Sequence, residues 1–542
     1  MTSRRALWGL IIVSGLLRLS WAASIGPGND EAYHYLFTVH PALSYFDHPP
    51  MLALIEAAGI SMAGGSVSTF SLRLGFVLLF AGSTWLMARL TSRFHGDRAG
   101  LLAAFALNVS AYHTAAAGAF ALPDGPLLFF WLLTLDRLTV ALGLDVEADS
   151  PGSDSRGATW PWIGVGLAWG CGMLSKYHAI FLPAGVLLYL AIEPKARGWL
   201  RKPGPYLAAI VGIAVFSPVL AWNASHGWVS FLFQAGRAVG ESTFRPETLV
   251  GALLLPALYL FPWIWARLVQ LLIGRLTRFF AGRATSVEKF LMAQAVLPLG
   301  TFLVVASRRA VLPHWTLVGF LPLLPLLGEL WRNNFEVNRS RFRRKALILA
   351  AMPVFIAILA VIQSRTGYFQ KGRPGGIGLV AAKEDPTVDT VGWDTIASEL
   401  QHRGLLDDPN TFLFTWRWYE SAHLGFATRG SRTPVLCYHA WDARSFAFWS
   451  RPEEWIGRDG ILVLVNGTPA EPDRFAKWFD RIEPIGSFDI VRSGSSVRNI
   501  RLYRCVRQGL AFPFDDLGST IKKGSNTVEK RVAAGTDSEV VR

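Results

Sequence analysis

Charged side chains are scarce in this chain of 542 residues, because only 17% of them are Asp, Glu, Lys or Arg. A soluble chain normally carries about 25%. Hydrophobic residues make up 51%, 21 residues are Trp, and the mean hydropathy is +0.32. This is more apolar surface than ordinary soluble cores bury. The shortage of charge therefore excludes an ordinary soluble protein and predicts a polytopic membrane protein.

Other absences narrow the functional class. Three cysteines are too few for a disulfide framework; Cys437 and Cys505 could form one pair, but their spacing does not decide it. The chain has no Walker A motif, no histidine spacing typical of a metal site and no internal repeat. The net charge of +14 does not require a nucleic-acid partner. Lys and Arg gather in the cytoplasmic loops of membrane proteins, which by itself explains an excess.

Eleven apolar segments approach the roughly 20 residues needed to cross a membrane. They predict an all-α polytopic bundle with spans at 6–23, 70–90, 99–117, 125–143, 160–175, 178–193, 206–222, 249–268, 288–306, 314–330 and 345–363. If the N-terminus is cytoplasmic, the inner loops together with the edges of the adjoining spans hold 22 Lys and Arg, and the outer loops hold 5. The positive-inside rule then places everything after residue 363 outside the cytoplasm, in the periplasm of a bacterium with two membranes.

Three regions follow from this pattern: a membrane domain at 1–363, an extracytoplasmic α/β domain at 364–510, and a polar, disordered tail at 511–542. The first outer loop, 24–69, contains no Lys or Arg. Within it, a helix is expected at 30–40. The apolar stretch 51–63 is too short to span and is expected to lie in the membrane interface.

The α/β domain is predicted from β-branched and aromatic runs separated by Gly, Pro and Asp. A helix is expected at 393–402, and strands are expected near 411–415, 434–439, 461–465, 488–491 and 500–505.

Acidic residues on the predicted outer side are candidates for chemistry. Asp30 and Glu31 follow the first span, and Asp124 lies in the short turn between the third and fourth spans. Each has a structural alternative, because acids cap helices and favour the first helical turn. Two acids at one mouth of a bundle can also bind a divalent cation or act as a general base. Both interpretations stay open at this point.

Aromatic and imidazole side chains accompany the first acid. His34 is four residues after Asp30 and so shares its helix face. Tyr33 and Tyr35 flank His34, as in a polar, aromatic sugar site. His48 precedes two prolines that fix a rigid turn, and Asp47-His48 could serve only to stabilise that turn.

Few Lys and Arg residues lie on the predicted outer side, so each of them is a candidate for a specific role. They are Lys176, Arg237, Arg245, Arg308 and Arg309. One interpretation is snorkelling to lipid headgroups. The other is a basic pocket for a phosphate. Acids and cations at one mouth suit a reaction in which a lipid phosphate is the leaving group.

Several motifs, in order, resemble the bacterial GT-C glycosyltransferases related to protein O-mannosyltransferases and to the lipid A aminoarabinose transferase. The first-loop signature is the most specific of them. The motifs are 30–35 (DEAYHY), 45–50 (YFDHPP), 122–127 (LPDGPL), 175–177 (SKY), Trp222-Asn223, Gly227-Trp228, 309–315 and Gly392-Trp393. The resemblance covers roughly residues 1–500. His34 departs from it, because the family more often has Tyr there.

The resemblance implies a helical bundle with amphipathic helices in the first outer loop and an outer C-terminal domain. It implies transfer of a sugar from a polyprenyl monophosphate with inversion of the anomeric centre. Asp30 is then the expected base or metal-orienting acid, Glu31 its partner and Asp124 the second acid, with a divalent metal ion at Asp30 and Asp124 as a possible cofactor. Substrate contacts are expected of Tyr33, His34, His48, Lys176, Tyr177, Arg245, Arg308 and Arg309.

The expected partners are the lipid-linked donor, membrane lipids of the inner membrane, and an acceptor. Lipid A, another envelope glycan and a protein hydroxyl all remain open as acceptors. A membrane transporter of a lipid-linked or anionic substrate is the alternative function. Transporters place charges at the bilayer midplane in paired, broken helices. Here the acids lie at the predicted outer mouth and no repeat is visible.

Overall fold

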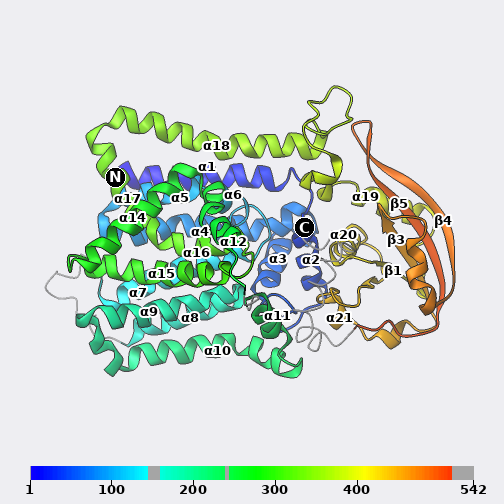
Figure 1. Cartoon of the computed structure of the whole chain (residues 1–542), viewed down its shortest axis with the longest axis horizontal. Coiled ribbons are helices and arrows are strands. Elements are labelled where there is room, and N and C mark those ends of the chain that lie inside the picture. Colours follow the sequence, from blue (N-terminus) through cyan, green and yellow to red (C-terminus); the bar gives the residue numbers. More distant parts are fainter. Residues whose placement is uncertain (1, 145–158, 239–242, 515–542) are drawn as a thin grey trace. The chain divides into compact units, whose positions relative to one another are not determined.

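The computed structural model describes residues 2–144, 159–238 and 243–514, and these residues form two compact units (Figure 1). The first unit consists of Met1–Ala22, His48–Ser225 and Arg237–Ile356. The second consists of Ala23–Asp47, His226–Gly236 and Ala357–Arg542. Part of the first predicted outer loop thus belongs to the same unit as the C-terminal sheet.

Six helices in the described part of the chain are long and apolar enough to cross a membrane. They are α1 (Thr2–Ala22), α4 (Thr69–His95), α7 (Asp124–Leu142), α10 (Pro203–Ser225), α15 (Ser286–Ala306) and α18 (Arg339–Thr366). A seventh span is possible where η2 (Tyr177–Ile180) and α9 (Phe181–Ile192) meet η3 (Pro194–Arg201) at a bend of 119°. Helices suit a bilayer because they satisfy their backbone hydrogen bonds internally. The membrane-spanning helical fold is confirmed, but the predicted count of eleven is not.

The remaining predicted spans are helical but short or broken. The segment 99–117 is divided into α5 (Asp97–Val109) and α6 (Ala111–Ala115), because Ser110 between them is extended. The segment 160–175 is α8 (Trp160–Ser175). Proline removes a backbone donor and clashes with the preceding turn. Prolines accordingly start the pieces of 249–268 and 314–330: α12 (Pro246–Leu254), α13 (Pro256–Leu260), α14 (Pro262–Phe280) and η4 (Pro313–Thr316). Three pieces follow η4: α16 (Leu317–Phe320), η5 (Leu321–Leu323) and α17 (Leu324–Val337).

Within the first unit, α8 packs between α7 and α10, and α4 packs against α5 and α7 (Figure 1). Trp131 and Trp162 are fully buried, whereas Ile12 and Leu16 of α1 are more than half exposed. Apolar side chains on the outside of such a bundle are suited to contact with lipid tails.

The apolar stretch 51–63 forms helix α3 (Met51–Met62), and its position in the membrane interface stays a prediction. It packs closely on α4 through two glycines. A Cβ added to Gly59 would lie 2.3 Å from the Ser71 carbonyl oxygen, and one added to Gly75 would lie 2.8 Å from the Ile55 oxygen. The two helices therefore approach each other at backbone contact.

The described part of the second unit contains a five-stranded sheet in the order β2-β1-β3-β5-β4. The strands are β1 (Thr411–Thr415), β2 (Val435–Cys437), β3 (Asp459–Val465), β4 (Phe479–Arg492) and β5 (Ser495–Gln508). Strand β1 is parallel to β2 and β3, and β5 is antiparallel to β3 and β4. Side chains of β3 are buried on both faces, which explains its unbroken apolar run.

The other elements of the second unit are α2 (Asn29–Val39), α11 (Val229–Ala238), α19 (Trp393–His402), α20 (Trp418–Ala427), α21 (Phe446–Trp449) and the short helices η6 (Ala382–Glu384), η7 (Pro386–Thr390), η8 (Pro452–Trp455) and η9 (Glu471–Trp478). Ile396 and Leu400 of α19 pack against Ile461 and Ile500 of the sheet. The predicted helices at 30–40 and 393–402 and all five predicted strands are confirmed.

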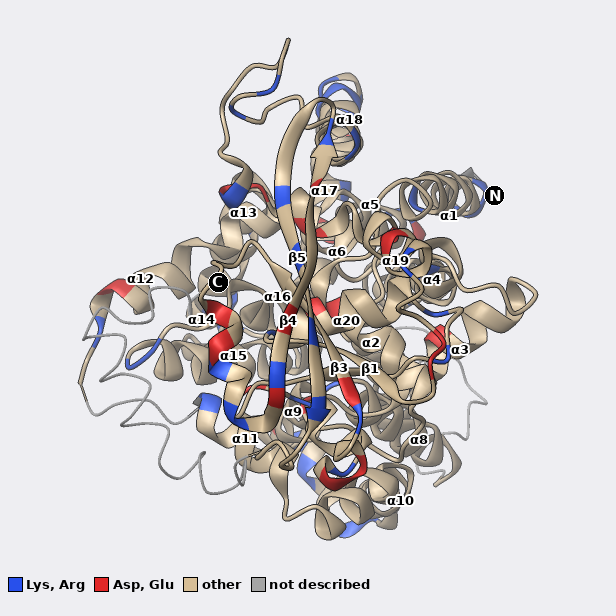
Figure 2. Ribbon diagram, turned by 90° about the vertical axis from the view of Figure 1, so that its right-hand side faces the viewer, with Lys and Arg blue, Asp and Glu red and all other residues tan. Residues whose placement is uncertain are grey.

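Strands β4 and β5 are longer than predicted, at 14 residues each. Charged residues are spaced along the hairpin (Figure 2), and some of them form exposed ion pairs, such as Arg507–Asp480 at 2.6 Å. The ends of these two strands are polar, so they lack the alternation of apolar and polar residues by which a sequence pattern predicts a strand. Cys437 and Cys505 are buried free thiols, so the possible disulfide is absent among the described residues. Most of the predicted disordered tail, from residue 515, lies outside the described residues.

Candidate active site

Asp124 and Lys176 form an ion pair in the first unit. The Lys176 Nζ donates to Asp124 Oδ1 at 2.8 Å, and the two side chains are 9% and 13% exposed, respectively. Asp124 is the first residue of α7, whereas Lys176 follows α8 in an extended conformation. The structure assigns the N-cap of α7 to Pro123, so the carboxylate pairs with a cation rather than capping the helix. The predicted meeting of an acid and a cation is observed here.

A small cavity adjoins this pair. Tyr112, His113 and His314 line it together with Asp124 and a wall of Ala117, Leu127, Leu128, Trp131, Leu317, Val318 and Leu321. The Tyr112 ring stacks on the His314 ring with centroids 6.0 Å apart. Sequence reasoning missed Tyr112 and His113, because both lie in a segment that it assigned to a continuous span. The helix break at Ser110, which precedes them, has no proline or glycine to signal it.

The other predicted cations of this unit lie at the end of α15. The Arg245 N–H donates to the Ser307 carbonyl at 2.7 Å, which places Arg245 beside Arg308 and Arg309. Arg237 lies over the Trp315 ring at 4.9 Å. These arginines are thus gathered by backbone and ring contacts at one end of the helix.

An aromatic cluster connects the Lys176 segment with Trp315. The His178 ring, two residues after Lys176, lies 6.0 Å from the Trp315 ring and 5.2 Å from the Phe302 ring. Tyr177 packs edge-on against Phe216 at 6.3 Å. His48 is half-buried and lies just before α3, so its predicted role as a substrate contact stays a prediction.

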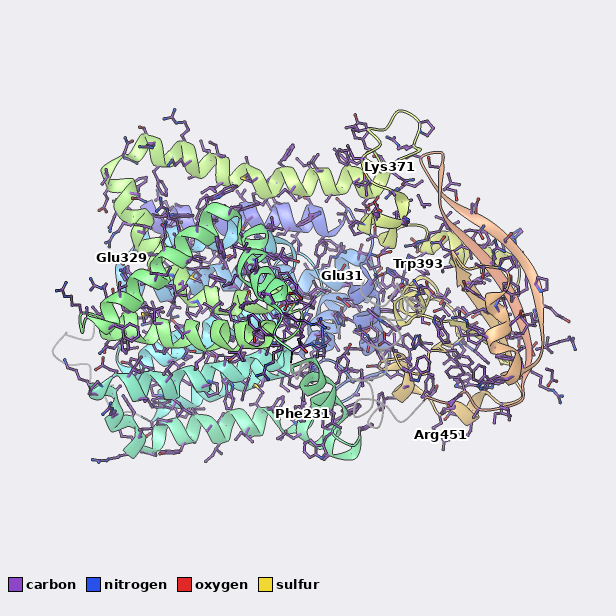
Figure 3. All side chains as sticks on the ribbon, in the orientation of Figure 1. Glu31, Phe231, Glu329, Lys371, Trp393 and Arg451 are labelled. Atoms are coloured by element: carbon purple, nitrogen blue, oxygen red, sulfur yellow. The ribbon has the colours of Figure 1, made fainter. Side chains whose placement is uncertain are left out.

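The acids Asp30 and Glu31 belong to the second unit, on α2 (Figure 3). Glu31 is 4% exposed, and its Oε2 accepts the Gly28 N–H at 3.0 Å, which closes the first turn of the helix. Glu31 therefore has the structural role named as an alternative for these acids, because it stabilises the first turn of α2. Asp30 is exposed, whereas Tyr33 and His34 are 0% and 1% exposed. Among these four side chains, Asp30 is the exposed one, and the predicted substrate contacts of Tyr33 and His34 stay predictions.

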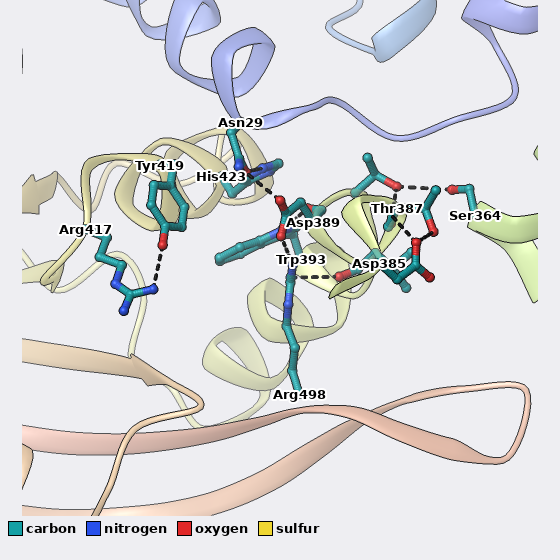
Figure 4. Close-up of polar contacts among 12 residues, drawn as sticks. Asn29, Ser364, Asp385, Thr387, Asp389, Trp393, Arg417, Tyr419, His423 and Arg498 are labelled. Carbon is teal, nitrogen blue, oxygen red and sulfur yellow. Dashed lines mark hydrogen bonds and ion pairs between the residues drawn. The ribbon is translucent and has the colours of Figure 1, made fainter. Parts of the chain in front are cut away.

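A polar network fixes the N-terminus of α2 (Figure 4). The Asn29 amide donates to Asp389 Oδ2 at 3.1 Å, and its oxygen lies 2.9 Å from His423 Nε2. The His423 ring stacks on Trp393 with centroids 4.7 Å apart. Burial, with the nearby Arg498 guanidinium, lowers the pKa of His423 to about 3. The imidazole is therefore neutral at physiological pH.

Glu420 of α20 is buried in the same unit. Burial raises the pKa of Glu420 to about 7 from 4.5, although Arg417 and Arg498 act in the opposite direction. Between these two pH values the unfolded chain has released the proton and the folded chain still holds it. This group therefore contributes stability below pH 4.5 that is lost as pH rises to about 7.

The described residues do not fit a divalent metal site. Residues 2–144, 159–238 and 243–514 contain no group of three or more His, Cys, Asp or Glu placed to hold a metal ion. Asp30 and Asp124 belong to different units, and the Asp124 carboxylate is engaged by Lys176. Oxygen ligands for such ions come in larger sets.

Comparison with known proteins shows what this chain is similar to. Residues 47–222, which include Asp124 and Lys176, match the family described as dolichyl-phosphate-mannose-protein mannosyltransferase. The resemblance to GT-C glycosyltransferases is confirmed. One similar protein is the undecaprenyl phosphate-alpha-4-amino-4-deoxy-L-arabinose arabinosyl transferase 1 of Pseudomonas fluorescens, 26% identical over 61% of this chain and 57% of that protein. Another is the lipid A galacturonosyltransferase RgtD of Rhizobium johnstonii, 27% identical over 36% of this chain.

The chain spans 57% and 38% of the lengths of these two GT-C relatives. Solved GT-C structures match over more of it. ArnT of Cupriavidus metallidurans in the apo state gives a TM-score of 0.62 at 13% identity, covering 93% of this chain and 98% of that one. The same protein bound to undecaprenyl phosphate gives 0.58 at 15% identity over 92% and 97%. The fold is therefore the GT-C fold.

Proposed function

We propose that this protein transfers a sugar from a polyprenyl monophosphate to a hydroxyl of a lipid A-like acceptor, with inversion at the anomeric carbon. The observation that carries the proposal is the buried Asp124–Lys176 pair, at 2.8 Å, inside the segment that matches the mannosyltransferase family. A buried ionisable pair in a membrane bundle is costly and marks a functional site by default. The named relatives are transferases, which favours this reaction over transport.

In this reaction the bond from the sugar C1 to the carrier phosphate oxygen breaks, and its electron pair stays on the phosphate. A bond from C1 to the acceptor oxygen forms on the opposite face. Negative charge therefore develops on the phosphate, and fixed cations in a site of low dielectric stabilise it. We assign that role to Lys176 and to Arg245, Arg308 and Arg309 at the end of α15, with Asp124 orienting Lys176.

The acceptor hydroxyl loses its proton as the new bond forms. A carboxylate within hydrogen-bond reach accepts that proton and contributes about 10²–10⁴-fold to the rate. Asp30 is assigned this role because its carboxylate is exposed, whereas Glu31 is buried and closes the helix turn. With a phosphate as acceptor no base would be needed.

The lipid A-like acceptor is supported by the name of the RgtD relative. Polyprenyl phosphate as the carrier is supported by the name of the Pseudomonas relative and by the ligand of the ArnT structure. We propose that the reaction takes place at the outer face of the inner membrane, with the C-terminal domain in the periplasm and the N-terminus in the cytoplasm; the distribution of Lys and Arg between the predicted loops supports this orientation.

The test uses purified full-length protein in nanodiscs, with polyprenyl-monophosphate hexose, hexuronic acid or pentose as donor. Lipid A and a hydroxyl-bearing peptide are offered as acceptors, and products are measured by mass spectrometry. We expect lipid A to gain the mass of one sugar. Asp124→Asn should abolish the gain, and Asp97→Asn, a matched change at the exposed start of α5, should not. Glycosylated peptide with unchanged lipid A would contradict the acceptor, and loss of all transfer in Asp97→Asn would contradict the site.

A further inference from the structure

Arg444 occupies an unusual backbone conformation in the loop between β2 and α21. Its φ is +50°, a region that residues other than glycine adopt only when their surroundings fix them. The guanidinium lies 3.7 Å from the centre of the Trp418 ring, and its Nη1 is 3.1 Å from Asp47 Oδ2. The Asp47 side chain is 2% exposed. A residue of the C-terminal part thus holds a buried carboxylate of the first loop.

The next residue, Ser445, contacts both motifs of that loop. The Tyr33 hydroxyl lies 2.8 Å from Ser445 Oγ and accepts the Ser445 N–H at 3.0 Å. The Phe46 N–H donates to the same Oγ at 3.4 Å. Tyr33 also lies 3.2 Å from Asp47 Oδ1, so its single proton is shared between two acceptors. Arg444 and Ser445 therefore join α2 to the turn that ends at Asp47.

The acidic residues around Arg444 favour its charged form. Burial alone would lower the pKa of Arg444, but the carboxylates of Asp47 and Asp442 outweigh it and raise that pKa. Arg444 Nε lies 3.5 Å from Asp442 Oδ1, and the guanidinium also interacts with Asp30. One cation is thus shared by three acids, including the proposed base.

We propose that Arg444 and Ser445 are positioning residues, which hold the helix bearing Asp30 and the turn bearing Asp47 in one fixed arrangement. This rests on the proposed glycosyl transfer. Asp47 is then an anchor and not a base, which gives a role to a motif residue that the chemistry leaves unused. The reason for expecting an effect on rate is geometric, because a misplacement of about 1 Å in an active site costs on the order of 100-fold.

The test compares Arg444→Met, Arg444→Lys, Ser445→Ala and the matched control Arg474→Met, all in full-length protein. Arg474 also lies over a tryptophan, Trp416, at 4.5 Å. Hydrogen exchange is measured over residues 29–50, and steady-state kinetics are measured with the lipid-linked donor. Arg444→Met should increase exchange in both halves of 29–50 and lower kcat about 10- to 100-fold with donor KM within about threefold. Arg444→Lys should recover part of kcat, and Arg474→Met should resemble wild type.

Exchange and kcat both at wild-type levels in folded Arg444→Met would overturn the proposal. If that variant does not fold, Ser445→Ala decides in the same way, since it removes only one hydroxyl. If wild-type protein shows no turnover, the proposed function is wrong. Hydrogen exchange over residues 29–50 would still test whether Arg444 and Ser445 hold this segment in place. Normal exchange with reduced donor affinity would mean that Arg444 contacts substrate and positions nothing.

Discussion

Replacing Lys176 with Met removes the cation from a buried ion pair and leaves the Asp124 carboxylate behind. At an effective dielectric constant near 20, charges 2.8 Å apart attract each other by about 6 kcal/mol. Desolvation offsets part of this, and breaking such a pair from one side typically costs about 3–5 kcal/mol. Lys176→Met and Asp124→Asn should therefore each destabilise the protein, and the double variant should lose much less than the sum of both.

The assay is a double-mutant cycle of thermal unfolding in one detergent at one protein concentration. We expect a coupling of about 1–3 kcal/mol between the two positions, because residues in contact are not additive. The matched control is Lys289→Met, which breaks a Lys–Glu193 pair at 3.1 Å in the same unit. That variant should lose stability but retain sugar transfer, whereas Lys176→Met should lose transfer.

Additive losses in the double variant would show that Asp124 and Lys176 do not interact in the folded protein. Normal kinetics in a folded Lys176→Met variant would remove this lysine from the phosphate site and leave a structural ion pair.

Three further outcomes are expected. A reporter that is active only outside the cytoplasm, fused after residue 370, should be active, and cytoplasmic activity there would reverse the topology. Gly59→Val should separate α3 from α4 and lower the melting temperature, whereas Gly64→Val, at an open turn with φ of +74°, should cost only backbone strain; equal losses would contradict the close packing. The stability of Glu420→Gln relative to wild type should be up to about 3 kcal/mol higher at pH 8 than at pH 4, because only the wild-type protein loses stability when the buried Glu420 becomes charged. A difference in melting temperature that does not change with pH would contradict the raised pKa.

The sequence predicted the membrane fold well where the signal was local. Long apolar runs and runs of β-branched residues can be recognised in the sequence directly, and the helices at 30–40 and 393–402 begin at turns that the local sequence indicates. The count of eleven spans was not confirmed, because at Pro256, Pro262 and Pro313 hydropathy alone does not separate one bent span from several short helices.

The sequence suggested which residues belong to the candidate site, but not which of them contact each other. The Asp124–Lys176 pair depends on how α7 and α8 pack, which no local pattern encodes. The burial of Tyr33 and the exposure of Asp30 depend on partners such as Ser445, which lies 412 residues beyond Tyr33 in sequence. The His423 contact to Asn29 spans 394 residues in the same way. Such long-range pairs arise only after the chain has folded.

The most direct measurement of the central claim is donor turnover by purified Asp30→Asn beside wild type. Asn has nearly the size and shape of Asp, and Asp30 is an exposed residue of the first turn of α2, whose N-cap is Gly28, so folding should be nearly unchanged while the charge is lost. We expect release of polyprenyl phosphate to fall about 10²–10⁴-fold with an unchanged melting temperature. A stable Asp30→Asn protein with near wild-type turnover would show that this acid is a structural residue of α2 and not the base.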